Sequence, residues 1–358
     1  MQVLKSVPIS GNFVIADSEG NIALQQTGLR PSRAGPSLLP GLGWRHNSAW
    51  LGLADPNELH SVINPPEGYI ATANNQHIEH AERLTTINID LGDYRVRRIK
   101  QLLEEGLKIN TTLSAADMER MQLDVFSLQA QRWMDVLRPL LPMSCEACKE
   151  LANWDLQYDG SSRGALLFTL FYNDITSAVM TSLFGAEAWK YLRIDGTAFY
   201  CLNQRIDDII LEGGSDLSAL IKNETRDELL VRILQQSLGS SSPHWQVYAS
   251  EANLGDLQSM THVNLFFQGR TGSIGLLLGL DRGPYSQQGS HATVVQGAQG
   301  VHYGMLVHAG PVWRYVTDMG ENGAWTVLAG GPSGVPGSPW YASELDMFHH
   351  GEFKRLQL

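Results

Sequence analysis

Two adjacent asparagines, Asn74 and Asn75, end a short apolar segment in the first quarter of the chain. The segment, GYIATA at residues 68–73, follows a Pro-Pro-Glu-Gly turn and predicts a β-strand. Asparagine is a poor strand former, and a buried carboxamide without a hydrogen-bond partner costs about 1–3 kcal/mol. We therefore expect at least one of the two side chains to have a partner, either in the protein or in a substrate. Alternatively, Asn74 could cap a helix formed by the following residues, QHIEHAERL.

A second pattern with chemical meaning is the C-x-x-C formed by Cys145 and Cys148. A structural zinc site needs about four ligands, usually two such pairs or one pair with two spaced histidines. The chain has only one further cysteine, Cys201, and the surrounding SCEACKELANW predicts a short helix. We therefore interpret the pair as buried or half-exposed helix cysteines rather than as a zinc or redox site.

Other polar groups are interpreted as structural. They are His349-His350 with Glu352 in a predicted C-terminal helix, Asp207, Asp208 and Glu212 at helical spacing, Arg314 with Asp318 at a strand end, and Ser333 in Gly-Gly-Pro-Ser-Gly. The histidine group is not expected to bind a metal. The acidic group predicts a solvent-exposed helix face, and Arg314 with Asp318 predicts an ion pair. Ser333 lacks the Gly-x-Ser-x-Gly frame of a nucleophile elbow, so we do not expect it to be a nucleophile.

The composition restricts the class of partner. The chain has 358 residues, 43% hydrophobic and 18% charged, as in an ordinary globular protein. Asp and Glu total 37 against 26 Lys and Arg, and the net charge of -11 argues against nucleic-acid binding. No apolar run reaches the roughly 18–20 residues of a membrane span, and no signal sequence follows Met1. We expect a cytoplasmic protein if Met1 is the natural start, and a periplasmic or secreted one if the chain is cut from a longer precursor.

The order of predicted elements is strands, then helices, then strands. Residues 1–78 are strand-rich, with a hairpin over 12–16 and 21–27 and a long loop whose Trp44 and Trp50 are expected to pack against a surface. Residues 79–240 show helical periodicity, with a capping box at Ser114 and Asp117. Residues 241–358 return to strands, including HVNLFFQG (262–269) and HATVVQG (291–297), and end in a short helix. The simplest architecture is one α+β layered domain with a helical insertion.

Six sequence pieces carry a resemblance to a known family. In order they are NFVIADSEGNIALQQTGLRPSR, NPPEGYIATANN, DYRVRRI, LANWDLQYDGSSRGALLF, GPVWRYVTDMG and GGPSGVPGSPWYASELDMFHHGEF. Together they resemble the second half of the large catalytic subunit of the penicillin amidase family of N-terminal-nucleophile hydrolases. The resemblance implies an α+β fold that is part of a four-layer αββα sandwich. It also implies amide hydrolysis by an N-terminal serine whose own amine is the base.

The resemblance assigns roles to two residues. Asn74 matches the family's oxyanion asparagine, whose NH2 stabilises the tetrahedral intermediate. Arg95, in DYRVRRI, corresponds to an arginine of the active-site network, where its guanidinium could hold the Asn74 carbonyl and leave the NH2 free. The alternative for Arg95 is a solvated basic helix face shared with Arg97, Arg98 and Lys100.

The chain also departs from the family's pattern. The segment that carries the nucleophilic serine is not in this sequence, so we expect no amide hydrolysis from the chain alone. The family's calcium carboxylate falls near residues 84–86, where the chain has no acid, so no cofactor is expected and calcium binding is doubtful. Pro332 and Trp340 replace the usual Gln and His of the C-terminal motif.

The sequence leaves more than one hypothesis for function. The first is the C-terminal part of an acylase for N-acylated small molecules, such as β-lactam side-chain amides or acyl-homoserine lactones, with a missing N-terminal catalytic segment or small subunit as partner. The second is a truncated, non-catalytic binding or scaffold protein that keeps the acylase-like surface. The third is a non-functional fragment with an exposed sheet edge that is prone to association.

Overall fold

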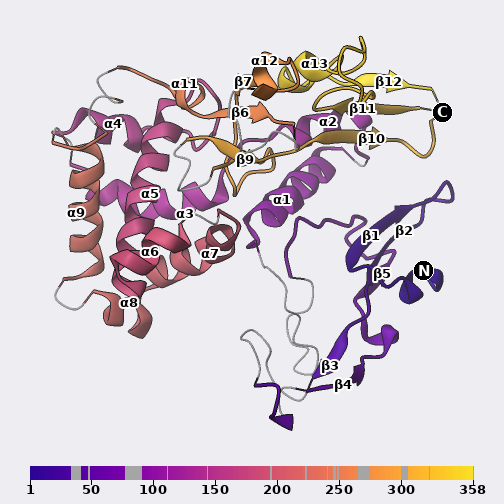
Figure 1. Cartoon of the computed structure of the whole chain (residues 1–358), viewed down its shortest axis with the longest axis horizontal. Helices are drawn as coiled ribbons and strands as arrows, with labels where there is room; N and C mark the ends of the chain where they lie inside the picture. Colours follow the sequence, from indigo (N-terminus) through magenta and orange to yellow (C-terminus); the bar gives the residue numbers. More distant parts are fainter. Residues whose placement is uncertain are drawn as a thin grey trace. The chain divides into compact units, whose positions relative to one another are not determined.

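A computed structural model describes residues 1–33, 42–46, 49–76, 91–110, 112–142, 144–193, 196–221, 224–239, 241–244, 247, 250–264, 274–299, 305–321 and 323–357 (Figure 1). The chain divides into two compact units. The first comprises Met1–Val96 with Asp318–Asn322, and the second comprises Arg97–Thr317 with Gly323–Leu358. Each unit is described by itself.

The first unit is built around a three-stranded antiparallel sheet in the order β1-β2-β5. β1 (Gly11–Ala16) and β2 (Ile22–Thr27) form the hairpin that the sequence predicts, and β5 (Ser61–Ile63) pairs with the other edge of β2. Asp17 fixes the turn, because its Oδ1 accepts the backbone N–H groups of Glu19 and Asn21. The unit also holds the short helices η1 (Val3–Ser6) and η3 (Pro56–Glu58) and the strand pair β3 (Pro31–Arg33) and β4 (Trp50–Leu53).

Two expectations for this unit are wrong. Residues 68–73 form no strand, and the strand in this part of the chain is β5, before the Pro-Pro-Glu-Gly turn. Trp44 and Trp50 are 80% and 67% exposed, so the expectation that this loop buries them against a surface is wrong. Among the described strands, β3 and β4 pair only with each other.

The helices that follow agree with the predicted periodicity. They are α1 (Tyr94–Ile109), α2 (Ala115–Gln122), α3 (Leu128–Leu137), η4 (Arg138–Leu140), α4 (Glu146–Ala152), α5 (Arg163–Phe184), α6 (Ala186–Leu192), α7 (Gly196–Glu212), α8 (Ser215–Leu220) and α9 (Arg226–Leu238). The predicted capping box at Ser114 and Asp117 is present, and Thr225 with Glu228 forms a second one. In each box the two side chains satisfy backbone N–H groups that a helix start leaves without partners.

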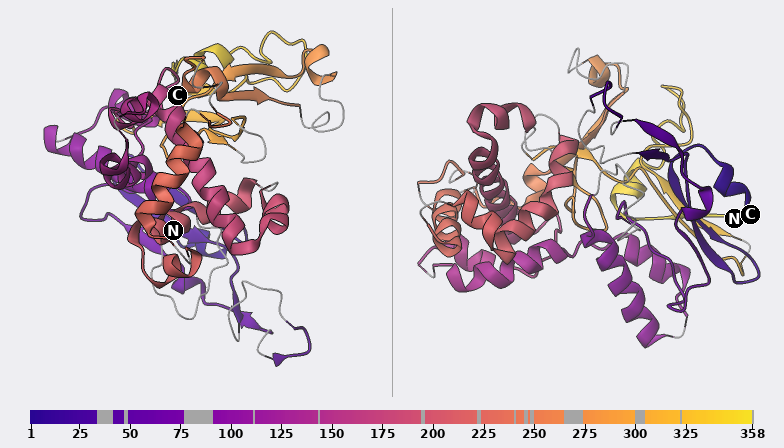
Figure 2. Two further views of the ribbon diagram at one scale, coloured as in Figure 1. Left: turned by 90° about the vertical axis from the view of Figure 1, so that its left-hand side faces the viewer. Right: turned by 90° about the horizontal axis from the view of Figure 1, so that it is seen from below.

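The core of the second unit surrounds α5, which lies among the other helices in Figures 1 and 2. α5 is apolar over most of its circumference, so it is buried on nearly all sides. Trp133, Phe168 and Phe171 are fully buried, and the rings of Trp133 and Phe171 meet edge to face at 5.8 Å. Gly164 permits close packing here, because a Cβ at this position would lie 2.3 Å from Trp154 Cγ.

The remaining elements of the second unit are short. They are α11 (Leu254–Leu257), β6 (Ser259–His262), α12 (Ile274–Leu277), β7 (Arg282–Ser286), β8 (Ala298–Gln299), β9 (Val307–Ala309), β10 (Trp313–Thr317), β11 (Ala324–Leu328), α13 (Leu345–His349) and β12 (Lys354–Leu356). β10, β11 and β12 form an antiparallel sheet, while β6 pairs with β7 and β8 with β9. The strand expected at 291–297 is instead a series of turns. Residues 265–269 of the other expected strand lie outside the described residues.

Cys145 and Cys148 form a disulfide, with their Cα atoms 5.1 Å apart. The interpretation as unpaired helix cysteines is therefore wrong, although the predicted helix α4 is present. Cys145 caps α4, because its Sγ accepts the backbone N–H of Cys148.

None of the described helices is long and apolar enough to cross a membrane.

Candidate active site

The two asparagines have different environments in the first unit. Asn74 has a positive φ of 62°, a left-handed conformation that asparagine tolerates better than most residues. The Asn75 side chain is used within the local turn. Its Oδ1 accepts the Ala73 N–H at 3.0 Å, and its Nδ2 donates to the Gln76 carbonyl at 3.2 Å. Asn75 therefore shapes the backbone that presents Asn74.

Arg95, in the first turn of α1, holds the Asn74 carboxamide. Its Nη2 donates to Asn74 Oδ1 and to the Ala73 carbonyl, both at 2.8 Å. Asn74 is solvent-exposed, and no described residue accepts a hydrogen bond from its Nδ2. The residues that would form the helix for which Asn74 is the alternative cap, from 77 onward, lie outside the described part of the chain. Among the described residues, the amide oxygen of Asn74 therefore has a hydrogen-bond partner and its NH2 group has no acceptor.

Arg95 also contributes positive charge. Burial lowers the pKa of its guanidinium, and no described carboxylate forms an ion pair with it. Its neighbours on α1 differ, since Arg97 is exposed and Arg98 makes a bidentate pair with Asp124. A half-buried cation behind an exposed amide NH2 favours an anion in front of that amide. This geometry could stabilise an oxyanion. Arg97 and Lys100, which belong to the alternative basic face, are exposed, whereas Arg95 is half-buried, and the oxyanion role stays a prediction.

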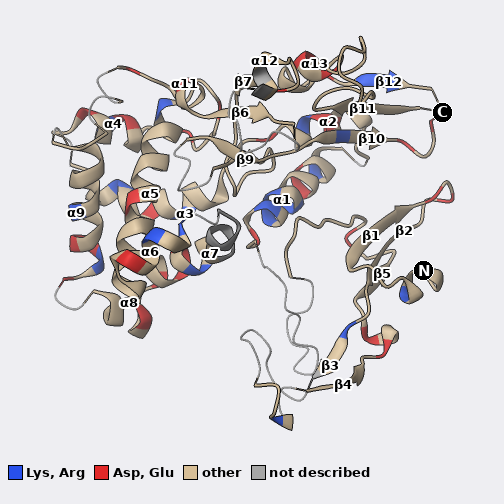
Figure 3. Cartoon of the chain, in the orientation of Figure 1, with Lys and Arg blue, Asp and Glu red and all other residues tan. Residues whose placement is uncertain are grey.

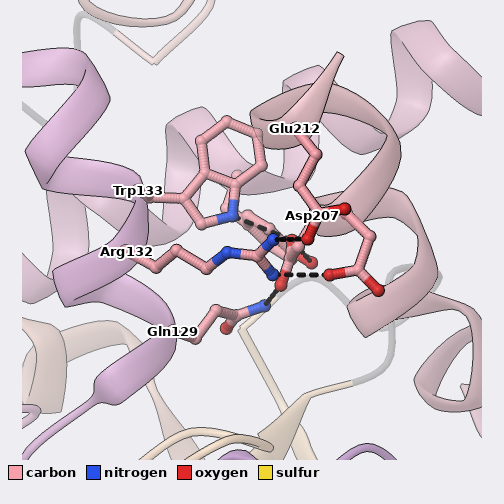
Figure 4. Close-up of polar contacts among 7 residues, drawn as sticks. Gln129, Arg132, Trp133, Asp207 and Glu212 are labelled. Carbon is pink, nitrogen blue, oxygen red and sulfur yellow. Dashed lines mark hydrogen bonds and ion pairs between the residues drawn. The ribbon is translucent and has the colours of Figure 1, made fainter. Parts of the chain in front are cut away.

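Asp207 lies in an environment different from the one expected from the sequence. Its side chain is fully buried, so the prediction of a solvent-exposed position is wrong. Its carboxylate accepts hydrogen bonds from Gln129 Nε2 and Trp133 Nε1, both at 2.8 Å, and from the Tyr172 hydroxyl at 2.9 Å (Figure 4). These donors come from α3 and α5, so Asp207 joins three helices. Three neutral donors satisfy this buried carboxyl group, which suits a structural role.

The other two acids of this group point outward. Asp208 and Glu212 pair with Arg132 of α3 at 2.6 and 2.7 Å (Figure 4). Glu212 is largely exposed and Asp208 is partly exposed. The prediction of a solvent-facing side of α7 is therefore confirmed for these two residues.

His349 has a partner that is distant in sequence. Its Nε2 lies 3.1 Å from His262 Nε2 of β6, and the Tyr285 ring of β7 stacks on it at 4.1 Å. Burial, together with repulsion from His262, lowers the pKa of His349 to about 4. His350 instead turns its Nδ1 to the Asp346 carbonyl. Among the described residues, no three His, Cys, Asp or Glu side chains form a group that could hold a metal ion.

Two further expectations concern the C-terminal region. The expected Arg314–Asp318 ion pair is absent among the described contacts, because Arg314 points into the protein. It donates to the Phe348 carbonyl at 2.7 Å and lies 4.0 Å above the Phe348 ring. Ser333 Oγ accepts the Val335 N–H within a turn.

Residues 84–86, where the resemblance places the family's calcium carboxylate, lie outside the described residues.

The fold matches that of a solved enzyme. A thermostable penicillin G acylase from Alcaligenes faecalis aligns with a TM-score of 0.68, covering 99% of this chain and 66% of the other at 16% sequence identity. At this identity the match shows the fold alone. The α+β class predicted from the sequence is confirmed, because the chain combines helices with antiparallel sheets and shares the fold of this acylase.

The sequence comparisons show the family. The penicillin amidase family description matches residues 3–358, and the chain belongs to this family. It is 27% identical to the acyl-homoserine lactone acylase QuiP of Pseudomonas aeruginosa, over 98% of this chain and 44% of QuiP. It is 29% identical to the penicillin acylase 2 proenzyme of Pseudomonas sp. strain SE83 over 48% of this chain and 22% of that protein. The chain thus spans less than half the length of these relatives.

Proposed function

We propose that the chain provides the oxyanion-stabilising part of an acylase that hydrolyses the linear amide of N-acylated small molecules. Asn74 Nδ2 would donate to the oxygen that becomes negative when a serine hydroxyl attacks the amide carbonyl. Arg95 is the positioning residue, since it binds Asn74 Oδ1 and adds positive charge behind the amide. The observation that carries the proposal is this one-sided hydrogen bonding, with Oδ1 held at 2.8 Å and Nδ2 without an acceptor among the described residues.

The serine nucleophile is proposed to lie on a polypeptide segment outside these 358 residues. Two observations support this. The chain covers 44% of the length of QuiP. In addition, β1 is an edge strand of its sheet among the described strands, and its Phe13, Val14 and Ile15 are exposed by 43%, 52% and 36%. An apolar edge strand is suited to pairing with a further strand.

The substrate class follows from the relatives. Their names point to acyl-homoserine lactones and to penicillins, and both contain a linear N-acyl amide. In the proposed reaction the serine oxygen attacks the amide carbon, and the C–N bond breaks as the nitrogen takes a proton. Water then releases the acid from the acyl-serine. Asn74 acts in both tetrahedral steps, because each places negative charge on the same carbonyl oxygen.

The test is complementation. The chain is combined with a separately expressed segment that carries the family's N-terminal serine, and hydrolysis of a chromogenic N-acyl amide is followed. Asn74→Ala is expected to lower kcat by about two to three orders of magnitude, as loss of one oxyanion donor does elsewhere.

Asn75→Ala is the matched control, because the adjacent asparagine uses its side chain in the local turn. It is expected to retain most of the activity. An Asn74→Ala enzyme as active as the parent would remove Asn74 from the mechanism. Turnover by the isolated chain that disappears in Ser333→Ala would overturn the proposal of an external nucleophile.

A further inference from the structure

The Cys145–Cys148 disulfide lies in the second unit and has no part in the proposed function. Its two cysteines differ in exposure. Cys145, the residue before α4, is half-buried, whereas Cys148, one turn into the helix, is 3% exposed and belongs to the hydrophobic core. The sulfur that a dissolved thiol meets first is therefore that of Cys145.

The disulfide is not needed to hold the turn that it spans. The Lys149 N–H donates to the Cys145 carbonyl at 3.1 Å, so the backbone also closes the first turn of α4. Leu151, further along the helix, is fully buried and anchors α4 in the core. A disulfide between residues only three apart restricts the unfolded chain little, because this stabilisation grows with the length of the closed loop. We therefore expect α4 to remain in place when the S–S bond opens.

The reduced form has a hydrogen-bond acceptor that the disulfide cannot use. Cys145 Sγ lies 3.9 Å from the Leu238 carbonyl oxygen at the end of α9. A disulfide sulfur carries no proton, so in the oxidised chain this is only a contact. A Cys145 thiol can donate its S–H to the carbonyl, and its sulfur can still accept the Cys148 N–H at 3.2 Å. Stabilisation of the reduced form makes a disulfide easier to reduce.

The charges of α4 do not exclude a negatively charged thiol. The acidic residues of this helix are among those drawn red in Figure 3. Glu146 pairs with Lys149 at 2.9 Å. Glu150 pairs with Arg163 of α5 at 2.6 Å. Each acid of α4 therefore has a cationic partner, although the chain as a whole has a net charge of -11. A small thiol that carries carboxylates can approach this helix without meeting an uncompensated acid of α4.

From this geometry we propose that Cys145–Cys148 is a thiol–disulfide exchange site for small thiols such as glutathione. A thiolate attacks Cys145 Sγ and forms a mixed disulfide, while the S–S bond breaks and the Cys148 sulfur keeps the electron pair and takes a proton. A second thiolate then attacks the sulfur of the first thiol, and the Cys145 sulfur leaves and takes a proton. In total two thiols are oxidised to one disulfide, and the cysteine pair gains two electrons and two protons.

The test follows reduction of the native 358-residue chain by glutathione at neutral pH. The exchange is stopped with acid, and the thiols are alkylated under denaturing conditions. Mass spectrometry then reads the tryptic peptide of residues 133–149, which contains both cysteines of the pair but not Cys201. The reference is the same chain unfolded in urea, where both cysteines are accessible.

The pair in the folded chain is expected to be reduced at most about tenfold more slowly than in urea, because the attacked sulfur is already accessible. The far-UV circular dichroism of the reduced chain should match that of the oxidised chain. A larger slowing would show a structural disulfide and overturn the inference. Loss of helical signal on reduction would overturn it as well, and so would two thiols that stay unpaired in oxidised glutathione.

Two variants identify the attacked sulfur, with oxidised glutathione as the probe and its addition to the same peptide as the readout. Cys148→Ala leaves Cys145 as the only thiol of the pair. Cys145→Ser keeps a capping residue at this position and leaves the buried Cys148, which is expected to react at least about tenfold more slowly. In urea the two rates should become similar. Equal rates without urea would overturn the assignment of Cys145, and the measurement on the parent chain does not depend on either variant.

Discussion

Asn74 in the first unit and Asp207 in the second are both polar side chains held by neighbours, but their hydrogen bonds are completed to different degrees. Asp207 is fully buried and accepts three hydrogen bonds from three side chains. Asn74 is exposed, and among the described residues only its oxygen has a hydrogen-bond partner, Arg95. The comparison indicates that a buried polar group with its bonding complete stabilises the fold, whereas a polar group fixed on one side is preorganised for a ligand. The following experiments separate the two kinds of group.

The largest effect is expected for Asp207→Ala. The substitution removes the buried acceptor to which the side chains of Gln129, Trp133 and Tyr172 donate. The free energy of unfolding is expected to fall by about 3–5 kcal/mol in total. Urea denaturation of the chain measures this loss. Asp208→Ala, at the next position but in a partly exposed ion pair, is the control and should cost less than about 1 kcal/mol. Similar losses for both variants would contradict the distinction.

A smaller effect is expected for Arg95→Ala in the complemented enzyme. Without its guanidinium the Asn74 carboxamide can rotate, and kcat should fall about tenfold to hundredfold with little change in KM. In an Asn74→Ala background the same substitution should add little, because Arg95 acts through Asn74. The control is Arg97→Ala, an exposed position two residues further along α1. Additive effects of the two substitutions would show that Arg95 does not work through Asn74.

The smallest effect is a pH dependence of stability at His349. Its pKa is lowered from 6.5 to about 4, first by burial and then by repulsion from His262, Arg314 and, least, His350, against the opposing attraction of Asp346. Between these pH values the unfolded chain binds a proton that the folded chain does not, so this part of the stability is complete above pH 6.5 and is lost as pH falls towards 4. The loss is expected to be about 1–2 kcal/mol, because the ring is partly exposed.

Urea denaturation of the parent and of His349→Gln across this pH range measures the contribution. The variant should show a flatter pH profile, whereas His350→Gln, at the exposed neighbouring histidine, should keep most of the parent's slope, because repulsion from His350 is the smallest cause of the lowered pKa of His349. A parent-like slope in His349→Gln would assign the titration to another group.

Local patterns predicted the elements that depend on nearby residues. The β1–β2 hairpin depends on the turn at Asp17, and α2 begins at the capping box of Ser114 and Asp117, so both are visible over a few residues of sequence. Residues 68–73 have strand composition but form no strand, because a strand also needs a partner with unpaired backbone groups. A tryptophan in a long loop is usually packed, but Trp44 is exposed, because its burial depends on contacts with residues distant in sequence.

The same reasoning explains what could be predicted about the sites. The pairing of Arg95 with Asn74 was expected from the family resemblance, and the structure has the two side chains in contact. The spacing of Asp207, Asp208 and Glu212 indicates a helix but not which side of it meets α3 and α5. The partners Trp133 and Tyr172 are separated from Asp207 by 74 and 35 residues. Nothing local to His349 reveals its contact with His262, which is 87 residues away.

The most direct test of the central claim is a crystal structure of the complemented enzyme with a boronic acid analogue of the tetrahedral intermediate bound to the serine. We expect Asn74 Nδ2 to lie about 2.7–3.1 Å from the analogue's oxygen, with Arg95 still bound to Asn74 Oδ1. An Asn74 amide turned away from the analogue, with its NH2 donated to a protein carbonyl, would contradict the account.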